Sequence, residues 1–397
     1  MKKILGNLFI CLAASLALAY PPAPPTLADA DNGFAFDLLK QIEKVQPVQN
    51  IFVSPYSVSV ALQMLENGAA GQTRGEMQDV LKTKNFPPDK LNAACRKLND
   101  SLLSLPDVTL DLANSIWYEK GLPLKKSFVS ANKKFFQAQL APVYFQSPES
   151  ADIINQWAEK KTRGRITGIV SFPFPRATRV VLANAIYFKG KWADTFDTNE
   201  TRLRDFYLPS GTLKQTLMMS QHKKFAYQEG DGFQAVKLPY AGGRLEMILF
   251  LPAANSSPEK LLAGFPTNWK NEILPRFSPR EGTVVFPKFK LDYDVTLNGP
   301  LEALGMRQAF NPEAADFSAM ADEPLFVSLI TQKSFVDVNE QGTEAAAVTT
   351  ITIGALAIIE NVPPPFEMIV DRPFLFVIED NSTGAILFTG IVNDPTL

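Results

Sequence analysis

The chain has 397 residues, of which 46% are hydrophobic, so it is long enough to bury a large core. Its 39 lysines and arginines nearly balance 41 acidic residues, and its formal net charge is -2. This balance, without a long basic run, argues against a nucleic-acid or membrane-surface partner. Length alone suggests two or three domains, but no linker divides the sequence.

The amino-terminal segment has the pattern of an export signal. Two lysines precede an apolar run over residues 4–19, which ends in Ala17-Leu18-Ala19, an A-x-A cleavage site. We therefore expect residues 1–19 to be a signal peptide and the protein to be secreted. The following residues, 20–31, are rich in proline and are expected to form an extended tether.

The two cysteines constrain the redox chemistry of the exported chain. Cys11 lies within the signal, and lipid attachment there remains an alternative, although bulky residues precede it. Cys95 is then the only cysteine left, which excludes an intramolecular disulfide. With a single histidine, His222, the sequence also lacks a metal-ligand set, and we expect no metal and no cofactor.

The first third of the exported chain has the periodicity of helices. Asn32 is expected to cap a helix with Leu38 and Ile42 on its apolar face. Thr73 and Glu76 have the spacing of a capping box for a later helix. These are structural signals, with no chemistry attached.

The remaining chain has mainly the patterns of strands. Period-two alternation predicts long strands at residues 108–118, 179–189, 283–291 and 325–338, and turn residues predict hairpins within 235–251 and 374–392. Helices followed by strands, without regular alternation, indicate an α+β fold in one domain, residues 32–397. His222 is expected to lie in a solvated loop.

An unusual stretch follows the last long strand. Residues 345–359 contain no charge and no proline, and most are small or β-branched, so this segment is fit to become a strand. Gly342 before it allows the chain to turn, whereas Pro363-Pro364-Pro365 after it must stand outside any central strand. Thr343, Ala345 and Ala347 would share one face of this strand, and all three are small, as expected of a strand that inserts among residues that are already packed.

This stretch carries a family resemblance. Residues 340–347 have the sequence Glu-Gln-Gly-Thr-Glu-Ala-Ala-Ala and are followed at a distance by 371–376, Asp-Arg-Pro-Phe-Leu-Phe. Together they resemble the hinge and carboxy-terminal signature of the serpins, and residues 50–57 and 184–192 match further serpin motifs in order. The resemblance is to secreted, bacterial-like members of the inhibitory type. It implies three β-sheets, about nine helices and an exposed reactive-centre loop over about residues 342–365.

The resemblance also implies a set of site residues. The hinge would consist of Glu340, Gly342, Thr343, Glu344, Ala345, Ala346 and Ala347. The scissile bond would be Leu356-Ala357, and cleavage at Ala355, Ala357 or Ile358 stays open because the loop is longer than usual. These residues would suit target proteases of chymotrypsin-like, subtilisin-like or elastase-like specificity.

Two clusters would control the opening of the main sheet in this family. Ser54, Ser57 and Asn184 match the polar cluster at its centre, with Gln332 in place of the usual histidine. The Gln332 amide still donates and accepts hydrogen bonds. Trp192, Lys288 and Glu340 match the upper opening, where an ion pair between Lys288 and Glu340 would hold the hinge.

The function implied is that of a monomeric suicide-substrate inhibitor of serine proteases, with cysteine proteases as a second target class. The cleaved loop would insert into the main sheet and trap the acyl-enzyme. A non-inhibitory relative, acting as a carrier, chaperone or storage protein, is the main alternative. An enzyme would have to rest on His222 and lacks every common catalytic motif, so no enzymatic activity is expected.

Overall fold

The computed structural model describes residues 26–230, 232–266, 269–343 and 363–396. Helix α1 (Leu27–Val45) begins earlier than expected, because Thr26 accepts a hydrogen bond from the Asp29 amide and the Asp29 carboxylate accepts from the Thr26 amide at 2.8 Å. The expected cap at Asn32 is wrong. Asn32 is buried inside the helix, where its side chain bonds Gly384 O at 2.7 Å and Ile386 N at 2.8 Å. Residues 27–31 are therefore helical, and the expected tether extended too far.

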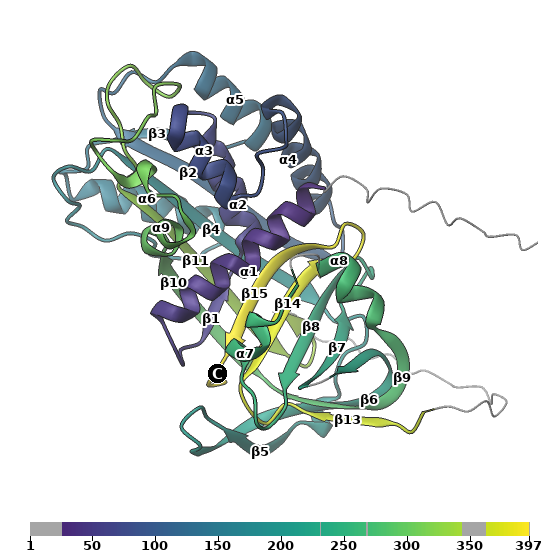
Figure 1. Ribbon diagram of the computed structural model, residues 1–397. Coiled ribbons are helices and arrows are strands. Elements are labelled where there is room, and N and C mark those ends of the chain that lie inside the picture. The colour runs from purple at the N-terminus through teal and green to yellow at the C-terminus, as the bar shows by residue number, and fades with distance from the viewer. Residues whose placement is uncertain (1–25, 231, 267–268, 344–362, 397) are drawn as a thin grey trace, which may run out of the picture.

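A six-stranded sheet crosses one half of the molecule, with α2 (Pro55–Glu66) on one face and α6 (Glu149–Lys161) on the other (Figure 1). Its strands, in spatial order, are β10 (Phe289–Thr296), β11 (Leu329–Asn339), β12 (Gly342–Thr343), β4 (Val180–Lys191), β2 (Val108–Glu119) and β3 (Gln139–Val143). The strands predicted from alternation at β2, β4 and β11 are confirmed. Strands β11 and β4 are parallel neighbours along one part of the sheet, and β12 separates them along another.

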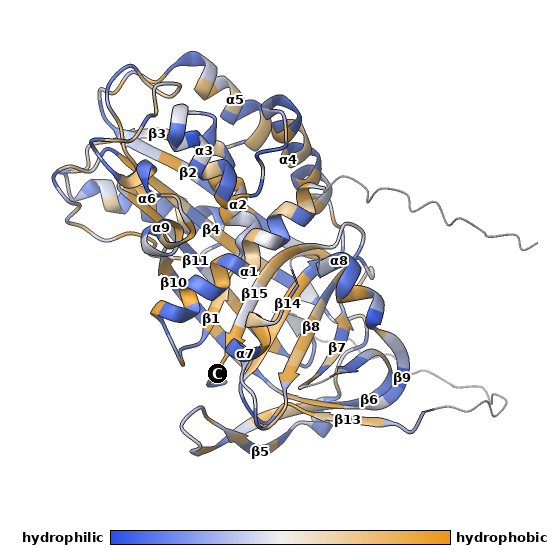
Figure 2. Ribbon diagram, in the orientation of Figure 1, coloured by the Kyte–Doolittle hydropathy of each residue, from blue (hydrophilic) through white to orange (hydrophobic). Residues whose placement is uncertain are grey.

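A nine-stranded sheet forms the other half, and several of its strands are strongly apolar (Figure 2). Its order is β1 (Ile51–Val53), β15 (Ala385–Val392), β14 (Phe374–Asp380), β8 (Leu245–Pro252), β7 (Phe233–Pro239), β6 (Leu213–Gly230), β9 (Ser278–Pro287) and β13 (Phe366–Ile369), with β5 (Arg202–Tyr207) paired to β6. Every residue of β8, β14 and β15 is buried. Both predicted hairpins, β7–β8 and β14–β15, are confirmed.

Three expectations about strands need correction. The strand predicted over residues 283–291 is two strands in different sheets, which part at Lys288. His222 lies within β6 and not in a loop. The α+β class is confirmed, but hydrogen bonds join the described strands into two sheets rather than three, since β6 pairs with β5 near one end and with β7 at the other.

The described residues hold nine α-helices, in agreement with the expected number. Besides α1 they are α2 (Pro55–Glu66), α3 (Gly71–Val80), α4 (Pro88–Leu103), α5 (Lys126–Phe136), α6 (Glu149–Lys161), α7 (Pro258–Ala263), α8 (Trp269–Glu272) and α9 (Asn298–Leu304). In the described ranges, no helix combines the length and apolarity needed to cross a membrane.

The expected capping box at Thr73 and Glu76 is wrong. Helix α3 starts at Gly71, and its cap position has no side-chain hydrogen bond. Thr73 Oγ1 instead accepts from the Asp316 amide at 2.9 Å, and Glu76 accepts from the amides of residues 307 and 308 at 2.8 Å. The two side chains therefore tie α3 to a distant segment.

Candidate functional site

The hinge lies at a place where the six-stranded sheet is parted. Strand β12 fits between β11 and β4, so that Thr343 is paired with Val338 on one side and with Gly190 on the other. Farther along, β11 and β4 pair directly in parallel, from Leu329 opposite Val181 to Phe335 opposite Tyr187. The sheet is thus closed over most of this seam and open where the hinge has entered.

Gly342, expected to be part of the hinge, lies in close contact with the backbone of β4. Its φ is +147°, and an added Cβ would lie 2.2 Å from Gly190 O and 2.7 Å from the Lys191 Cα. Both of these atoms belong to the backbone of β4 and cannot turn aside. Any larger residue would push β12 away from β4.

Thr343 follows with its side chain fully buried. Its Oγ1 lies 2.8 Å from the Tyr240 hydroxyl, and the Tyr240 ring stacks on Trp192 with 4.7 Å between ring centroids. Burial raises the pKa of the Tyr240 phenol well above its usual value, so the hydroxyl stays protonated. The first residue of the hinge to enter the sheet therefore has a polar partner inside the core.

The expected ion pair is present above β12. Glu340 is 6% exposed, its carboxylate lies 3.0 Å from Lys288 Nζ, and it accepts a hydrogen bond from Thr201 Oγ1 at 2.8 Å. Burial alone would raise the pKa of Glu340. Its own backbone amide, Lys288 and Thr201 outweigh that effect and lower the pKa below 4.5. The Trp192 indole also donates to Asn339 O at 2.9 Å.

The four residues of the expected central cluster meet at the closed part of the seam. Gln332 accepts from the Ser54 amide at 2.8 Å, donates to Ser54 O at 3.0 Å and donates to Asn184 Oδ1. Ser54 Oγ donates to Leu387 O at 2.6 Å, and the Ser57 amide donates to Ser54 Oγ at 3.2 Å. A glutamine thus links β11, β4 and the start of α2 with its amide satisfied.

Asn184 extends this cluster toward β2. Its side-chain nitrogen donates to Ser57 Oγ and to Asn114 Oδ1. Asn114 lies directly opposite Asn184 in the β2–β4 pairing. A chain of buried amides therefore crosses three strands of the sheet, Gln332 in β11, Asn184 in β4 and Asn114 in β2.

Sequence reasoning missed three contributors, Tyr240, Thr201 and Asn114. Tyr240 meets Thr343 from 103 residues away, and no local pattern marks that contact. Asn114 did carry a signal, because it is an amide in the middle of a strand that is otherwise apolar on the same face. The expected site residues Glu344, Ala345, Ala346, Ala347, Leu356 and Ala357 lie outside the described residues.

Among the described residues, no catalytic arrangement forms around His222. His222 Nδ1 lies 2.9 Å from Thr283 Oγ1, and its Nε2 is 3.4 Å from an exposed carboxylate, that of Glu281. Within the described ranges, no group of three or more histidine, cysteine and acidic side chains could hold a metal ion.

Comparison with known proteins agrees with the fold. The chain is 34% identical over 399 residues to glia-derived nexin of Rattus norvegicus, with 98% of each chain covered. It is 35% identical to leukocyte elastase inhibitor A of Mus musculus over 93% of this chain and 99% of the relative.

Solved structures give the same result. The native state of tengpin, a thermophilic serpin, matches with a TM-score of 0.85 and 27% identity, over 95% of this chain and 96% of that one. Human thyroxine-binding globulin in complex with its ligand also matches with a TM-score of 0.85, at 26% identity, over 94% and 99% of the two chains. The family model for serpins, described as serine protease inhibitors, matches residues 29–395. The chain therefore belongs to the serpin family, a family of serine protease inhibitors and not of enzymes, with inhibitors among its relatives.

Proposed function

We propose that this chain is a suicide-substrate inhibitor of serine proteases, with cysteine proteases as a second target class. The observation that carries the proposal is the position of β12, whose two residues already lie between β11 and β4. A target protease would cleave the loop, the freed segment would continue the path that β12 has begun, and the acylated protease would be carried along. Its catalytic geometry would be distorted before deacylation.

The pairing of β12 defines where the following residues would lie. Continued in the same register, Ala345 would fall between Phe188 and Val336, and Ala347 between Ile186 and Ser334. These positions face the main core, because Phe188, Ile186 and Val336 are core residues. Small side chains in the hinge suit such crowded positions.

Farther along the same register, Thr349 would arrive between Asn184 and Gln332. Its hydroxyl could replace the hydrogen bond that these two amides now make with each other. Ile351 would follow between Leu182 and Ile330, both fully buried. The sequence of the loop thus matches the polar and apolar character of the seam residue by residue.

Insertion of the cleaved loop would release enough free energy to drive the proposed mechanism. About a dozen new backbone hydrogen bonds at about 1 kcal/mol each, together with burial of two isoleucines, supply more than about 10 kcal/mol. A shift of about 5.5 kcal/mol already inverts a two-state population. The native form would therefore be kinetically trapped, and the hydrogen bonds of Gln332 across the seam are suited to maintain the trap.

The proposal also includes the class of target protease and the location of the protein. We place the scissile bond at Leu356-Ala357, with its neighbours as alternatives, which suits proteases with apolar or small primary specificity. We also propose a secreted monomer with a signal peptide over residues 1–19, which would be periplasmic or on the cell surface if the source is bacterial.

A non-inhibitory role is the second candidate, because thyroxine-binding globulin shares this fold. The observation that favours inhibition over it is the small, buried hinge at Gly342 and Thr343.

The test is to mix the protein with chymotrypsin, subtilisin and elastase and to look for a complex that survives SDS. We expect a covalent complex with at least one of them and release of a carboxy-terminal peptide that begins near Ala357. If every protease clips the loop and stays fully active, the chain is a substrate and the proposal is wrong.

A further inference from the structure

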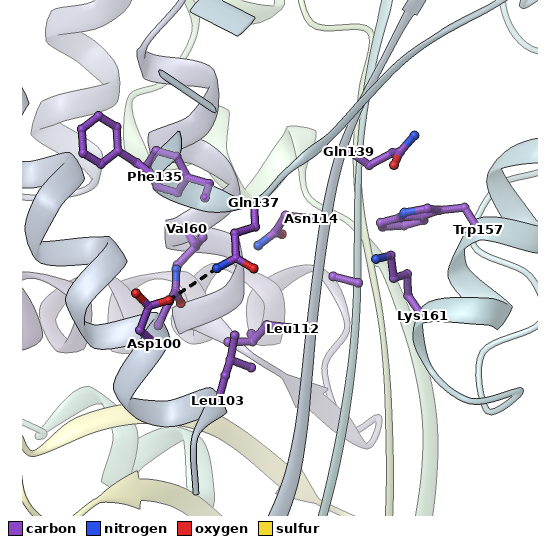
Figure 3. A pocket seen from close by; sticks show the side chains of 13 residues that line it. Val60, Asp100, Leu103, Leu112, Asn114, Phe135, Gln137, Gln139, Trp157 and Lys161 are labelled. Carbon is purple, nitrogen blue, oxygen red and sulfur yellow. Dashed lines mark hydrogen bonds between the residues drawn. The ribbon is translucent and has the colours of Figure 1, made fainter. Parts of the chain in front are cut away.

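Polar side chains gather at two places away from the hinge. The first is a cavity of about 130 Å³ beside β2, where Trp157 and Lys161 lie on one side of the strands and Asn114 lies on the other (Figure 3). These groups do not converge on one point. The second is a buried cluster of three ionisable side chains in the nine-stranded sheet, next to α8. In this cluster the ionisable groups contact one another.

The cluster consists of Lys237 in β7, Glu246 in β8 and Glu379 in β14. Glu379 and Glu246 lie directly opposite each other in the antiparallel pairing of β14 with β8. Lys237 Nζ contacts Glu246 Oε1 and lies 3.4 Å from Glu379 Oε1. The side chains are 13%, 8% and 0% exposed, in the order given above. Two buried carboxylates therefore share one ammonium group, and one negative charge is uncompensated when both are ionised.

The other charged groups around the cluster have partners or lie at the surface. Arg244 pairs with Asp380, the next residue along β14, at 2.9 Å. Lys270 of α8 donates to Thr383 O at 3.3 Å. The further charged residues of α8 and of the turn after it are exposed, namely Glu272 and Arg276. Among the described residues, Lys237 is therefore the cation that the two glutamates share.

The cluster is joined to α8 through Trp269. The indole N–H donates to Glu379 Oε2 at 2.7 Å, and the residue is 1% exposed. The ring packs against Phe36 of α1, Phe250 of β8 and Phe265, with centroid distances of 5.3, 5.7 and 5.9 Å. Since α8 has four residues, too few for a helix that is stable by itself, this anchor holds it against the sheet.

Protonation of Glu379 removes the extra charge. The pKa of Glu379 is raised from 4.5 to about 7. Burial is the largest cause and a hydrogen bond with Glu246 adds to it, whereas Lys237 and Trp269 act in the other direction. If α8 lifts, water reaches Glu379 and its pKa returns toward 4.5, so opening releases a proton. Opening of α8 is therefore favoured as the pH rises from about 5 to about 7.

We infer that Lys237, Glu246 and Glu379 form a pH-sensitive lock for α8, which is closed in mild acid and opens more often near neutrality. A protonated Glu379 can donate to Glu246 and still accept from Trp269, so the polar groups of the cluster are satisfied. When Glu379 is ionised, both carboxylates depend on one ammonium group, and hydration of Glu379 favours the open form. The lock does not depend on the inhibitory function.

Hydrogen exchange of the backbone amides of residues 269–277, followed by mass spectrometry, tests this inference. After correction for intrinsic exchange, we expect α8 to open about thirtyfold more often at pH 7 than at pH 5. Proton linkage gives this factor for a group with a pKa of about 7 in the closed form and 4.5 in the open form. Equally frequent opening at the two pH values would overturn the inference.

Variants show whether the cluster is the cause, because Asp31 of α1 also has a raised pKa and α1 packs against α8 through Phe36. In Glu379→Gln the amide imitates the protonated acid, so we expect opening to be about equally frequent at the two pH values. Glu272→Gln, at an exposed position on α8, is the matched control and should keep the full change. A pH dependence that persists in Glu379→Gln would overturn the inference.

A second variant keeps the test decisive if Glu379→Gln does not fold. Glu246→Gln removes the uncompensated charge and leaves Glu379 with Lys237 to itself, so we expect the change between pH 5 and pH 7 to shrink to about threefold or less. A change that stays at about thirtyfold in Glu246→Gln would show that the cluster does not control α8.

Discussion

Glu340 is the buried acidic residue next to the proposed hinge, where it pairs with Lys288. Its pKa is lowered in the folded protein, so its ion pair stabilises the fold above the unfolded pKa of about 4.5, and this contribution is lost as the pH falls through the folded pKa. We expect Glu340→Gln to lower the free energy of unfolding by about 2 kcal/mol at neutral pH and by less in acid. Thermal melts against pH measure this, with exposed Glu200→Gln as the control. A loss that is the same at every pH would contradict the assignment.

The pKa of Asp31 is shifted in the opposite direction, so its effect on stability depends on pH in the opposite way. Asp31 is buried in α1, and burial raises its pKa from 3.8 to about 7, although a hydrogen bond from Ser59 lowers it. The folded state therefore retains a proton that the unfolded state releases, so stability is highest below the unfolded pKa and falls as the pH rises toward 7.

We expect Asp31→Asn to be more stable than the parent at about pH 8, by about 2–4 kcal/mol, and to approach it near pH 4. Urea unfolding at the two pH values gives the comparison. A variant that is less stable at pH 8 would show that the carboxylate is ionised in the fold.

At the scale of elements, the proposed mechanism requires β11 and β4 to separate along the part of the seam where they now pair. Gln332→Leu would leave the backbone amide of Ser54 buried without a partner, whereas Ser54 O would keep its bond from the Val58 amide at 3.1 Å, so we expect a cost of about 1–3 kcal/mol. We expect faster loss of inhibitory activity on warming, because the native form is easier to open. Lys333→Gln, whose side chain faces the other way on β11, is the control. Equal rates of activity loss in the two variants would show that Gln332 does not hold β11 and β4 together.

The short strand β12 allows a second test. Thr343→Arg would place a charge at a fully buried position. We expect at least a roughly tenfold loss of SDS-stable complex, with cleaved inhibitor accumulating in its place. The control is Glu344→Arg, since in the continued register residue 344 would lie between the half-buried Lys189 and Asp337. Unchanged trapping by Thr343→Arg would contradict the hinge assignment.

The elements predicted correctly are those whose pattern is local. Strands β2, β4 and β11 lie where the sequence pattern predicts them. The break at Lys288 was missed, although β9 ends in four consecutive buried residues, Val284 to Pro287, and strict alternation begins only with β10. The start of α1 was a missed signal, since Thr26 and Asp29 form a capping box that is visible in the sequence.

For the molecule as a whole, the α+β class and the site clusters came from the sequence, the latter through motifs shared with a family. Contacts such as Tyr240 with Thr343 depend on how two sheets pack and have no local signature. The partial entry of the hinge is likewise a property of the whole fold. It requires β11 and β4 to be parallel neighbours that can also separate.

The central claim is that the intact protein is less stable than the form with its cleaved loop inserted in the sheet. Thermal unfolding of the loop-cleaved protein tests this claim most directly. Insertion worth more than about 10 kcal/mol should raise the melting temperature of the nicked protein by more than about 10 °C over the intact protein. If the nicked and intact proteins melt at the same temperature, or the nicked protein melts lower, the cleaved loop does not enter the sheet.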